Sequence, residues 1–206
     1  MKMNMENFEI ITLSNQESNV YVLDVSNIAI KKNNIELTSL DLIKLSSTRV
    51  ESKKKEILGI RYLRNKIIGL TDINYDSQIG YPFISNGPYI SISHSNNLVA
   101  LAINPKKIIG VDIEKISDRV IKLAHKFLSE KELSQLVELS ALEITKYWSI
   151  KEVLYKIAHV KSMSFKNDLE VKNVCSTSAI GIIKKKNTIE NIRIHQLNNM
   201  MICFNS

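Results

Sequence analysis

The stretch Gly110-Val111-Asp112-Ile113-Glu114 has the pattern of a β-strand that ends in acidic side chains. Because side chains alternate between the two faces of a strand, Val111 and Ile113 should share one face, and Asp112 and Glu114 the other. An acidic pair of this kind often lies on a solvated face. Here it ends an otherwise apolar strand, since the two residues before Gly110 are isoleucines. We therefore predict that the two carboxylates lie at a cleft.

A second stretch, Trp148-Ser149-Ile150-Lys151-Glu152-Val153-Leu154-Tyr155-Lys156, is expected to form a helix. Glu152 and Lys156 are four residues apart and would share one face of that helix, which by itself is a common surface arrangement. Together with the strand, however, the helix supplies three carboxylates and neighbouring lysines. Hard divalent cations and their phosphate ligands require such oxygen-rich, charged surroundings. The sequence thus predicts magnesium chemistry on a phosphorylated substrate.

The composition limits the class of protein. The chain has 206 residues, 44% of them hydrophobic, and a net charge of +7 from 28 Lys and Arg against 21 Asp and Glu. This length allows one large domain or two small ones, and the charge favours an anionic partner such as a nucleic acid, a membrane surface, a nucleotide or an acidic protein.

Cys175 and Cys203 form no C-x-x-C pair and suggest buried thiols in a reducing compartment. Residues 1–13 lack a signal-peptide core and no apolar run reaches ~18 residues, so we expect a cytoplasmic protein without a membrane span.

Strand and helix patterns alternate along the chain. Strands are expected at residues 8–13, 21–25, 89–93, 98–103 and 108–114, and in the tail from 169 to 204, interrupted at 184–187. Helices are expected at residues 37–45, 50–68, 119–125, 130–140 and 143–159, the fourth opened by a capping box of Ser129 and Glu132. Asn104-Pro105-Lys106-Lys107 is the best internal break. The order predicts an α+β fold and permits two related lobes.

The usual glycine-rich phosphate loops are absent from the sequence. The chain has six glycines and neither a G-x-x-x-x-G-K-[ST] loop nor a G-x-G-x-x-G turn. This disfavours kinases and ATPases with those loops, and Rossmann dehydrogenases. A phosphate ligand would therefore be held by side chains and a metal ion.

Five motifs occur in a defined order along the chain. They are Gly80-Tyr81-Pro82, Ile92-Ser93-His94-Ser95, Gly110 to Glu114, Phe127-Leu128-Ser129 with Glu132, and Trp148-Ser149 with Lys151-Glu152 and Lys156. Over residues 50–165 this combination resembles the 4′-phosphopantetheinyl transferase superfamily, in particular its Sfp type. The resemblance implies an α+β fold of two pseudo-twofold-related lobes, each a small, mainly antiparallel sheet packed with helices. The lobes would comprise residues 1–106 and 107–206, with the active site at their interface.

The resemblance also implies an activity and its residues. Such enzymes move the 4′-phosphopantetheine arm of coenzyme A to a serine of an apo carrier protein and release adenosine 3′,5′-bisphosphate. Asp112, Glu114 and Glu152 would hold magnesium, with manganese as an alternative. Coenzyme A would be contacted at its 3′-phosphate by Arg49, Lys54 and Arg61. His94, with Ser93 beside it, would approach the other phosphates. Lys151 or Lys156 would contact the pyrophosphate, and Lys156 is favoured because it shares a helix face with Glu152. Asp112, Glu152 and Lys156 would be catalytic, with Glu152 favoured as the base that accepts the serine proton.

The sequence departs from the family pattern at two places. Tyr81 stands where relatives often have the lysine of Gly-Lys-Pro, so one phosphate-binding lysine is missing. His159-Val160-Lys161-Ser162 replaces a turn that is often glycine-rich, which puts the local backbone geometry in question. All three acidic positions are present, which argues against an inactive homologue.

We expect a monomer whose basic surface meets an acidic acyl or peptidyl carrier protein. Fatty-acid, polyketide, aryl-polyene and peptide-synthetase carriers all remain open. One alternative is a catalytically weak or inactive homologue that acts as a carrier-binding module. The other is a basic nucleic-acid-binding protein, which ranks lower because the few aromatic residues do not interleave with basic ones.

Overall fold

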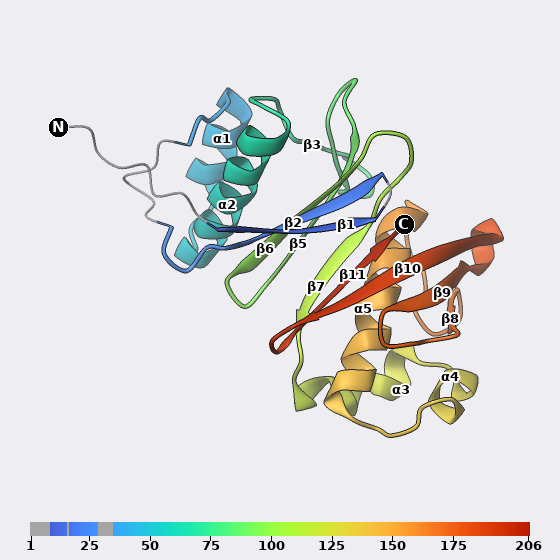
Figure 1. Cartoon of the computed structure of the whole chain (residues 1–206). Helices are drawn as coiled ribbons and strands as arrows, with labels where there is room; N and C mark the ends of the chain where they lie inside the picture. Colours follow the sequence, from blue (N-terminus) through green and yellow to red (C-terminus); the bar gives the residue numbers. More distant parts are fainter. Residues whose placement is uncertain (1–8, 16, 29–34) are drawn as a thin grey trace.

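The strands form two main antiparallel sheets, each covered by helices on its outer face (Figure 1). We describe residues 9–15, 17–28 and 35–206 of a computed structural model. The first sheet has the order β1-β2-β6-β5 and contains β1 (Ile10–Asn15), β2 (Ser18–Asp24), β5 (Tyr89–Ser95) and β6 (Leu98–Asn104). Its helices are α1 (Ser39–Ser47) and α2 (Glu51–Ile67), and a small hairpin of β3 (Asn74–Tyr75) and β4 (Pro82–Phe83) follows them.

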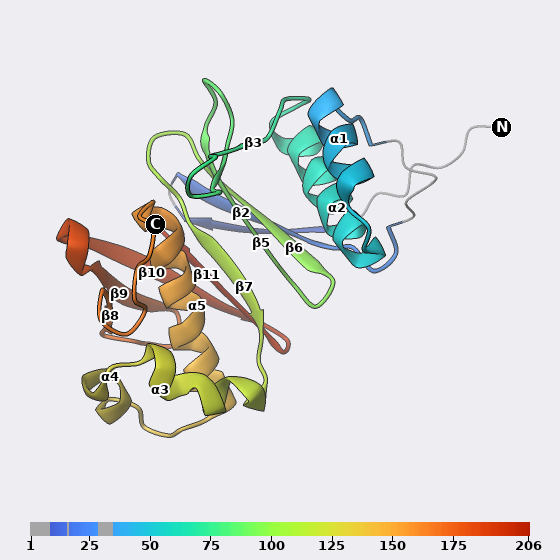
Figure 2. The same ribbon diagram turned by 180° about the vertical axis from the view of Figure 1, so that it is seen from behind.

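The second sheet has the order β7-β11-β10-β9-β8. Its strands are β7 (Val111–Lys115), β8 (Leu169–Lys172), β9 (Ser178–Ile183), β10 (Thr188–Leu197) and β11 (Met200–Asn205). The helical elements of this half are η1 (Asp118–Leu123), α3 (Ala124–Phe127), α4 (Glu130–Ser134), α5 (Ala141–Ala158) and η2 (Lys184–Lys186). Seen from behind, α5 crosses the face of this sheet turned away from the first sheet (Figure 2). The predicted α+β architecture with two sheet lobes is confirmed.

Three apolar clusters hold these layers together. One lies between α2 and the first sheet, and another between α5 and the second sheet. The third joins the two sheets and includes Ala100 and Ala102 of β6 beside Val111 and Ile113 of β7. Because side chains alternate along a strand, the larger Val99 and Leu101 of β6 face α2 while the small alanines face the other sheet. The small residues allow the two sheets to approach closely.

The two sheets also meet along their edges through serine side chains. Edge strands β5 and β7 run side by side, and the hydroxyl oxygens of three β5 serines accept hydrogen bonds from β7 amides. Ser91 Oγ accepts from Val111 N at 3.1 Å, Ser93 Oγ from Ile113 N at 3.2 Å, and Ser95 Oγ from Lys115 N at 3.3 Å. The regular spacing shows that the strands are parallel. The serines satisfy amides that would otherwise be unpaired at the edge of a sheet.

Ser91→Ala should lower the free energy of unfolding by about 1–3 kcal/mol, because the buried amide of Val111 loses its only acceptor among the described residues. Chemical denaturation measures this change. Ser46→Ala is the matched control, since exposed Ser46 only donates to a carbonyl of its own helix. An equal, small effect of both substitutions would show that the serine contacts between the sheets contribute nothing to stability.

A tight turn at Asn96 and Asn97 connects β5 to β6. Asn96 and Asn97 both have positive φ, at 49° and 64°. A two-residue hairpin turn of type I′ requires this at both central positions, and asparagine tolerates it better than most residues. The two expected strands therefore form an antiparallel hairpin.

Two helix predictions need correction. The capping box of Ser129 and Glu132 is present, but α4 ends at Ser134 instead of residue 140. Ser140 is the N-cap of the next helix, α5, so the chain is not helical between them. Val137 in this connection is fully exposed and packs against no apolar cluster among the described residues. The helix predicted for residues 119–125 is a 3₁₀ turn followed by α3.

The predicted boundary between residues 106 and 107 lies in the connection from β6 to β7, where the chain passes from one sheet to the other. The division into two domains and the pseudo-twofold relation of the lobes stay predictions. Among the described residues, the helices are too short or too polar to span a bilayer.

Candidate functional site

Asp112 is the centre of a polar cluster where β5, β7 and α5 meet. Its side chain is 3% exposed and accepts three hydrogen bonds. Ser93 Oγ and Lys156 Nζ donate to Oδ1 at 3.0 and 2.9 Å, and Ser149 Oγ donates to Oδ2 at 2.9 Å. Lys156 also donates to the carbonyl oxygen of Val111 at 2.7 Å. Both lobes therefore contribute to the surroundings of one buried carboxylate.

Glu114 lies two residues further along β7 on the same face. Its carboxylate accepts from Trp148 Nε1 at 3.2 Å and from Ser95 Oγ at 3.4 Å. Burial raises the pKa of Glu114, and the nearby charge of Asp112 raises it further. The predicted placement of the two acidic residues on one face of β7 is thus confirmed, since both side chains contact α5.

Glu152 of α5 adds the third carboxylate. It makes no hydrogen bond or ion pair within the part of the chain that the structure describes. Its pKa is raised to about 7, first by burial and then by the charge of Asp112, with a smaller contribution from Glu114, while Lys156 lowers it. Burial and the charges of Asp112 and Glu114 therefore disfavour the ionised form of Glu152.

The three carboxylates are ligands of the type that a hard divalent cation prefers. Their side chains do not form a closed ligand shell. Among residues 9–15, 17–28 and 35–206, no three His, Cys, Asp or Glu side chains are grouped closely enough to hold a metal ion together. Asp112 instead has its oxygens engaged by Lys156 and two serines. The mutual repulsion of Asp112, Glu114 and Glu152, and the unpartnered state of Glu152, nevertheless fit the oxygen ligands that magnesium prefers.

Glu152→Gln should make the metal-free protein more stable at pH 8 by about 2 kcal/mol and leave it unchanged near pH 4. The folded pKa of about 7 lies above the ordinary value of 4.5, so between these pH values the folded state binds more protons than the unfolded state. Stability of the parent protein therefore falls as pH rises through this window, and glutamine removes the fall. Denaturation at several pH values in the presence of a chelator measures it, with exposed Glu138→Gln as the control. Parallel pH profiles for parent and Glu152→Gln would contradict the assignment.

A second group of charges lies on the α2 side of β5. His94 Nδ1 is 3.4 Å from Glu56 Oε2, and Lys53 Nζ donates to the same oxygen at 2.9 Å. Burial lowers the pKa of His94, as do the charges of Lys53 and Lys156, while Glu56 raises it. Since Lys156 acts on both His94 and Asp112, the histidine belongs to the electrostatic surroundings of the carboxylate cluster.

Two residues predicted to contact coenzyme A are buried in ion pairs. Lys151 is 0% exposed, and its ammonium donates to Glu132 and to the carbonyl oxygens of Phe127, Phe165 and Leu169 at 2.8–3.0 Å. Arg61 is 2% exposed and pairs with Asp41. Both cations are therefore buried within the fold, and a phosphate contact of either stays a prediction.

The remaining predicted residues at the 3′-phosphate are accessible. Lys54 lies 2.8 Å from Glu51 on the partly exposed start of α2. Arg49 is exposed in the connection between α1 and α2. The role of both residues at a phosphate stays a prediction.

Other site residues were not identified from the sequence. In the sequence Ser149 and Trp148 are only members of a motif, yet both donate to the β7 carboxylates. Helical spacing was a usable signal, because Ser149, Glu152 and Lys156 lie at i, i+3 and i+7 on one face.

The two departures from the family pattern contact each other. Tyr81, next to β4, stacks on His159 at the end of α5, with ring centroids 3.9 Å apart and planes inclined by 10°. His159 has a left-handed backbone with φ 48°, which explains why a glycine would also suit this position. The hairpin of the first lobe is thereby joined to the second lobe beside the carboxylate cluster.

Comparisons with known proteins agree with these motifs. Residues 108–198 match the model of the 4′-phosphopantetheinyl transferase superfamily. The 4′-phosphopantetheinyl transferase gsp of Aneurinibacillus migulanus is 29% identical over 117 residues, which are 52% of this chain and 49% of that protein. The 4′-phosphopantetheinyl transferase Sfp of Bacillus subtilis (strain 168) is 32% identical over 118 residues, 52% of either chain. The chain thus spans about half the length of the curated relatives it matches.

Proposed function

Because the chain belongs to the 4′-phosphopantetheinyl transferase superfamily, we propose that it transfers the 4′-phosphopantetheine arm of coenzyme A to a serine of an apo carrier protein. The second product is adenosine 3′,5′-bisphosphate. The observation that carries this proposal is the electrostatic coupling of Glu152 with Asp112, Glu114 and Lys156 between β7 and α5.

Magnesium, or manganese in its place, would be held by Asp112, Glu114 and Glu152 and would supply positive charge to the pyrophosphate of coenzyme A. The raised pKa of Glu152 supports this role, since a cation relieves the repulsion between the three carboxylates. Ser93 and Ser149 position the oxygens of Asp112 by donating to them.

In the reaction, the carrier serine oxygen attacks the phosphorus that bears the pantetheine arm. The bond from that phosphorus to the bridging oxygen of the pyrophosphate breaks, and this oxygen leaves with adenosine 3′,5′-bisphosphate. Negative charge grows on the oxygens around the transferred phosphoryl group. The ammonium of Lys156 would stabilise this charge, and His94, with Ser93 beside it in the chain, would approach the phosphates. Glu152 is the proposed acceptor of the serine proton.

Coenzyme A and an acidic acyl or peptidyl carrier protein are the proposed partners. The net charge of +7 supports this choice, because a basic surface speeds the encounter with an acidic partner. A monomeric enzyme in the cytoplasm, with one lobe formed by residues 1–106 and the other by 107–206, completes the proposal.

Mass spectrometry of apo carrier proteins tests the function. Each carrier is incubated with the protein, coenzyme A and magnesium, and a mass gain equal to the pantetheine phosphate arm is expected on at least one of them. B. subtilis Sfp, run in parallel, shows which carriers are competent substrates. Binding of a carrier without any mass gain would favour the inactive binding module. Salt-dependent binding to duplex nucleic acid, unaffected by loss of Asp112, would favour the nucleic-acid-binding alternative.

A further inference from the structure

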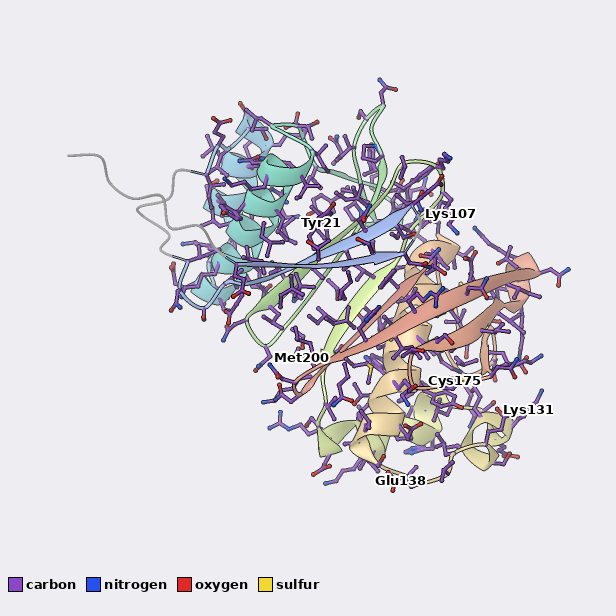
Figure 3. The ribbon with its side chains drawn as sticks, in the orientation of Figure 1. Tyr21, Lys107, Lys131, Glu138, Cys175 and Met200 are labelled. Atoms are coloured by element: carbon purple, nitrogen blue, oxygen red, sulfur yellow. The ribbon has the colours of Figure 1, made fainter. Side chains whose placement is uncertain are left out.

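A separate cavity lies in the second lobe where α4, β8 and α5 meet. Its volume is about 330 Å³, and it is lined by Lys131, Gln135, Tyr147, Lys172, Asn173 and Val174. Figure 3 labels Lys131 on α4, at the side of the molecule remote from α1 and α2. Polar atoms make up most of the lining. Small-molecule sites begin at about this volume.

The cavity is on the opposite side of α5 from the carboxylate cluster. Tyr147 and Ser149 are two residues apart, and successive helical residues turn by about 100°. Ser149 contacts Asp112, so Tyr147 points to a different side of the helix, toward the cavity that it lines. The cavity is therefore not part of the proposed active site.

Tyr147 provides an unused hydrogen-bond donor in this cavity. Its side chain is 3% exposed, and within the described residues its hydroxyl group makes no hydrogen bond. Its hydroxyl oxygen is not sealed from solvent, so the hydroxyl group is accessible from the cavity as a donor to a bound ligand. Burial and the charges of Glu132 and Glu143 raise its pKa, which keeps the hydroxyl protonated as a donor.

The rim of the cavity carries more positive than negative charge. Lys131 and Lys172 share one carboxylate, that of Glu170, at 3.0 and 3.5 Å. Each ammonium has three N–H groups, so both retain donors for another acceptor. Two cations against one carboxylate leave one positive charge in excess, and Gln135 and Asn173 add amide groups beside them.

We propose that this cavity binds a small phosphate monoester. Lys131, Lys172 and Tyr147 lie on three different elements, and a phosphate offers three terminal oxygens to such convergent donors. The remaining volume and Val174 accommodate a body of about the size of a sugar. Neither the site nor its ligand depends on the proposed transferase activity.

Nuclear magnetic resonance titration of the full chain with ribose 5-phosphate tests this site. The backbone amides of Gln135, Lys172 and Asn173 should shift in a saturable manner. Tyr147→Phe keeps the packing and removes one donor, so the dissociation constant should rise about tenfold. Lys172→Gln, at a position that is 40% exposed, should weaken binding similarly without affecting the fold. Lys126→Gln, which removes an exposed lysine elsewhere, should leave the constant unchanged.

Three outcomes would overturn the proposal. The first is an unchanged dissociation constant in both Tyr147→Phe and Lys172→Gln. The second is a set of shifts confined to residues around Asp112 and His94, which would place the ligand in the carboxylate cluster. The third is equal affinity for inorganic phosphate and ribose 5-phosphate, because an ester should gain several-fold from the additional contacts of its sugar.

Discussion

Asp112→Asn should reduce transfer of the pantetheine arm to an apo carrier by about a thousandfold. Asp112 is buried, belongs to the proposed metal site, and joins Ser93, Ser149 and Lys156 through both of its oxygens. Asparagine has nearly the same shape but no negative charge, and its amide nitrogen would face a hydroxyl or an ammonium donor. The initial rate of mass gain on the carrier, at saturating coenzyme A and magnesium, measures the effect.

The same substitution also tests the metal site without a catalytic readout. Magnesium should raise the melting temperature of the parent protein, because a ligand that binds only the folded state stabilises it. This increase should be absent in Asp112→Asn. Exposed Asp118→Asn should retain both the transfer rate and the thermal response to magnesium. Transfer by Asp112→Asn within tenfold of the parent rate would refute the role of this carboxylate.

The alternating pattern of β7 was sufficient to predict which face carries the acidic residues. Side chains of a strand alternate between its two faces, so the acidic residues must lie on one face once the apolar residues face the other sheet. The contacts of Asp112 and Glu114 with α5 confirm this placement. The third carboxylate depended on how α5 crosses that strand. This crossing is set by long-range packing of apolar side chains, which no local pattern specifies.

Lys151 and Arg61 show why burial of a basic residue is hard to predict from the sequence. In sequence both belong to basic helices, and a basic residue is normally solvated or binds an anion. The structure instead pairs each with an acidic residue that also completes a helix capping box, Glu132 for Lys151 and Asp41 for Arg61. The capping box of Ser129 already accounted for Glu132 in the sequence, and no local pattern indicated a second partner for Glu132 or Asp41 about 20 residues away.

Lys151→Met should lower the free energy of unfolding by about 3–5 kcal/mol, because it leaves Glu132 as an unpaired charge inside the protein. The lysine also donates to three carbonyl oxygens, which come from the end of α3 and from the segment that leads into β8. Methionine fills much of the volume of the lysine stem, so the loss is mainly electrostatic. Chemical denaturation of the purified protein, followed by circular dichroism, measures it.

A second variant separates the charge from the packing. Adding Glu132→Gln to Lys151→Met removes the unpaired carboxylate, while the glutamine oxygen can still accept from the amide of Val171. The double variant should therefore be more stable than Lys151→Met alone, and exposed Lys126→Met should match the parent protein. A loss below about 1 kcal/mol in Lys151→Met would be at odds with a buried ion pair.

Since Lys151 directly precedes Glu152, its hydrogen bonds to α3, α4 and the β8 segment also hold this turn of α5 in place. The Lys-Glu pair of the motif thus combines a residue that positions the helix with one that faces the carboxylate cluster.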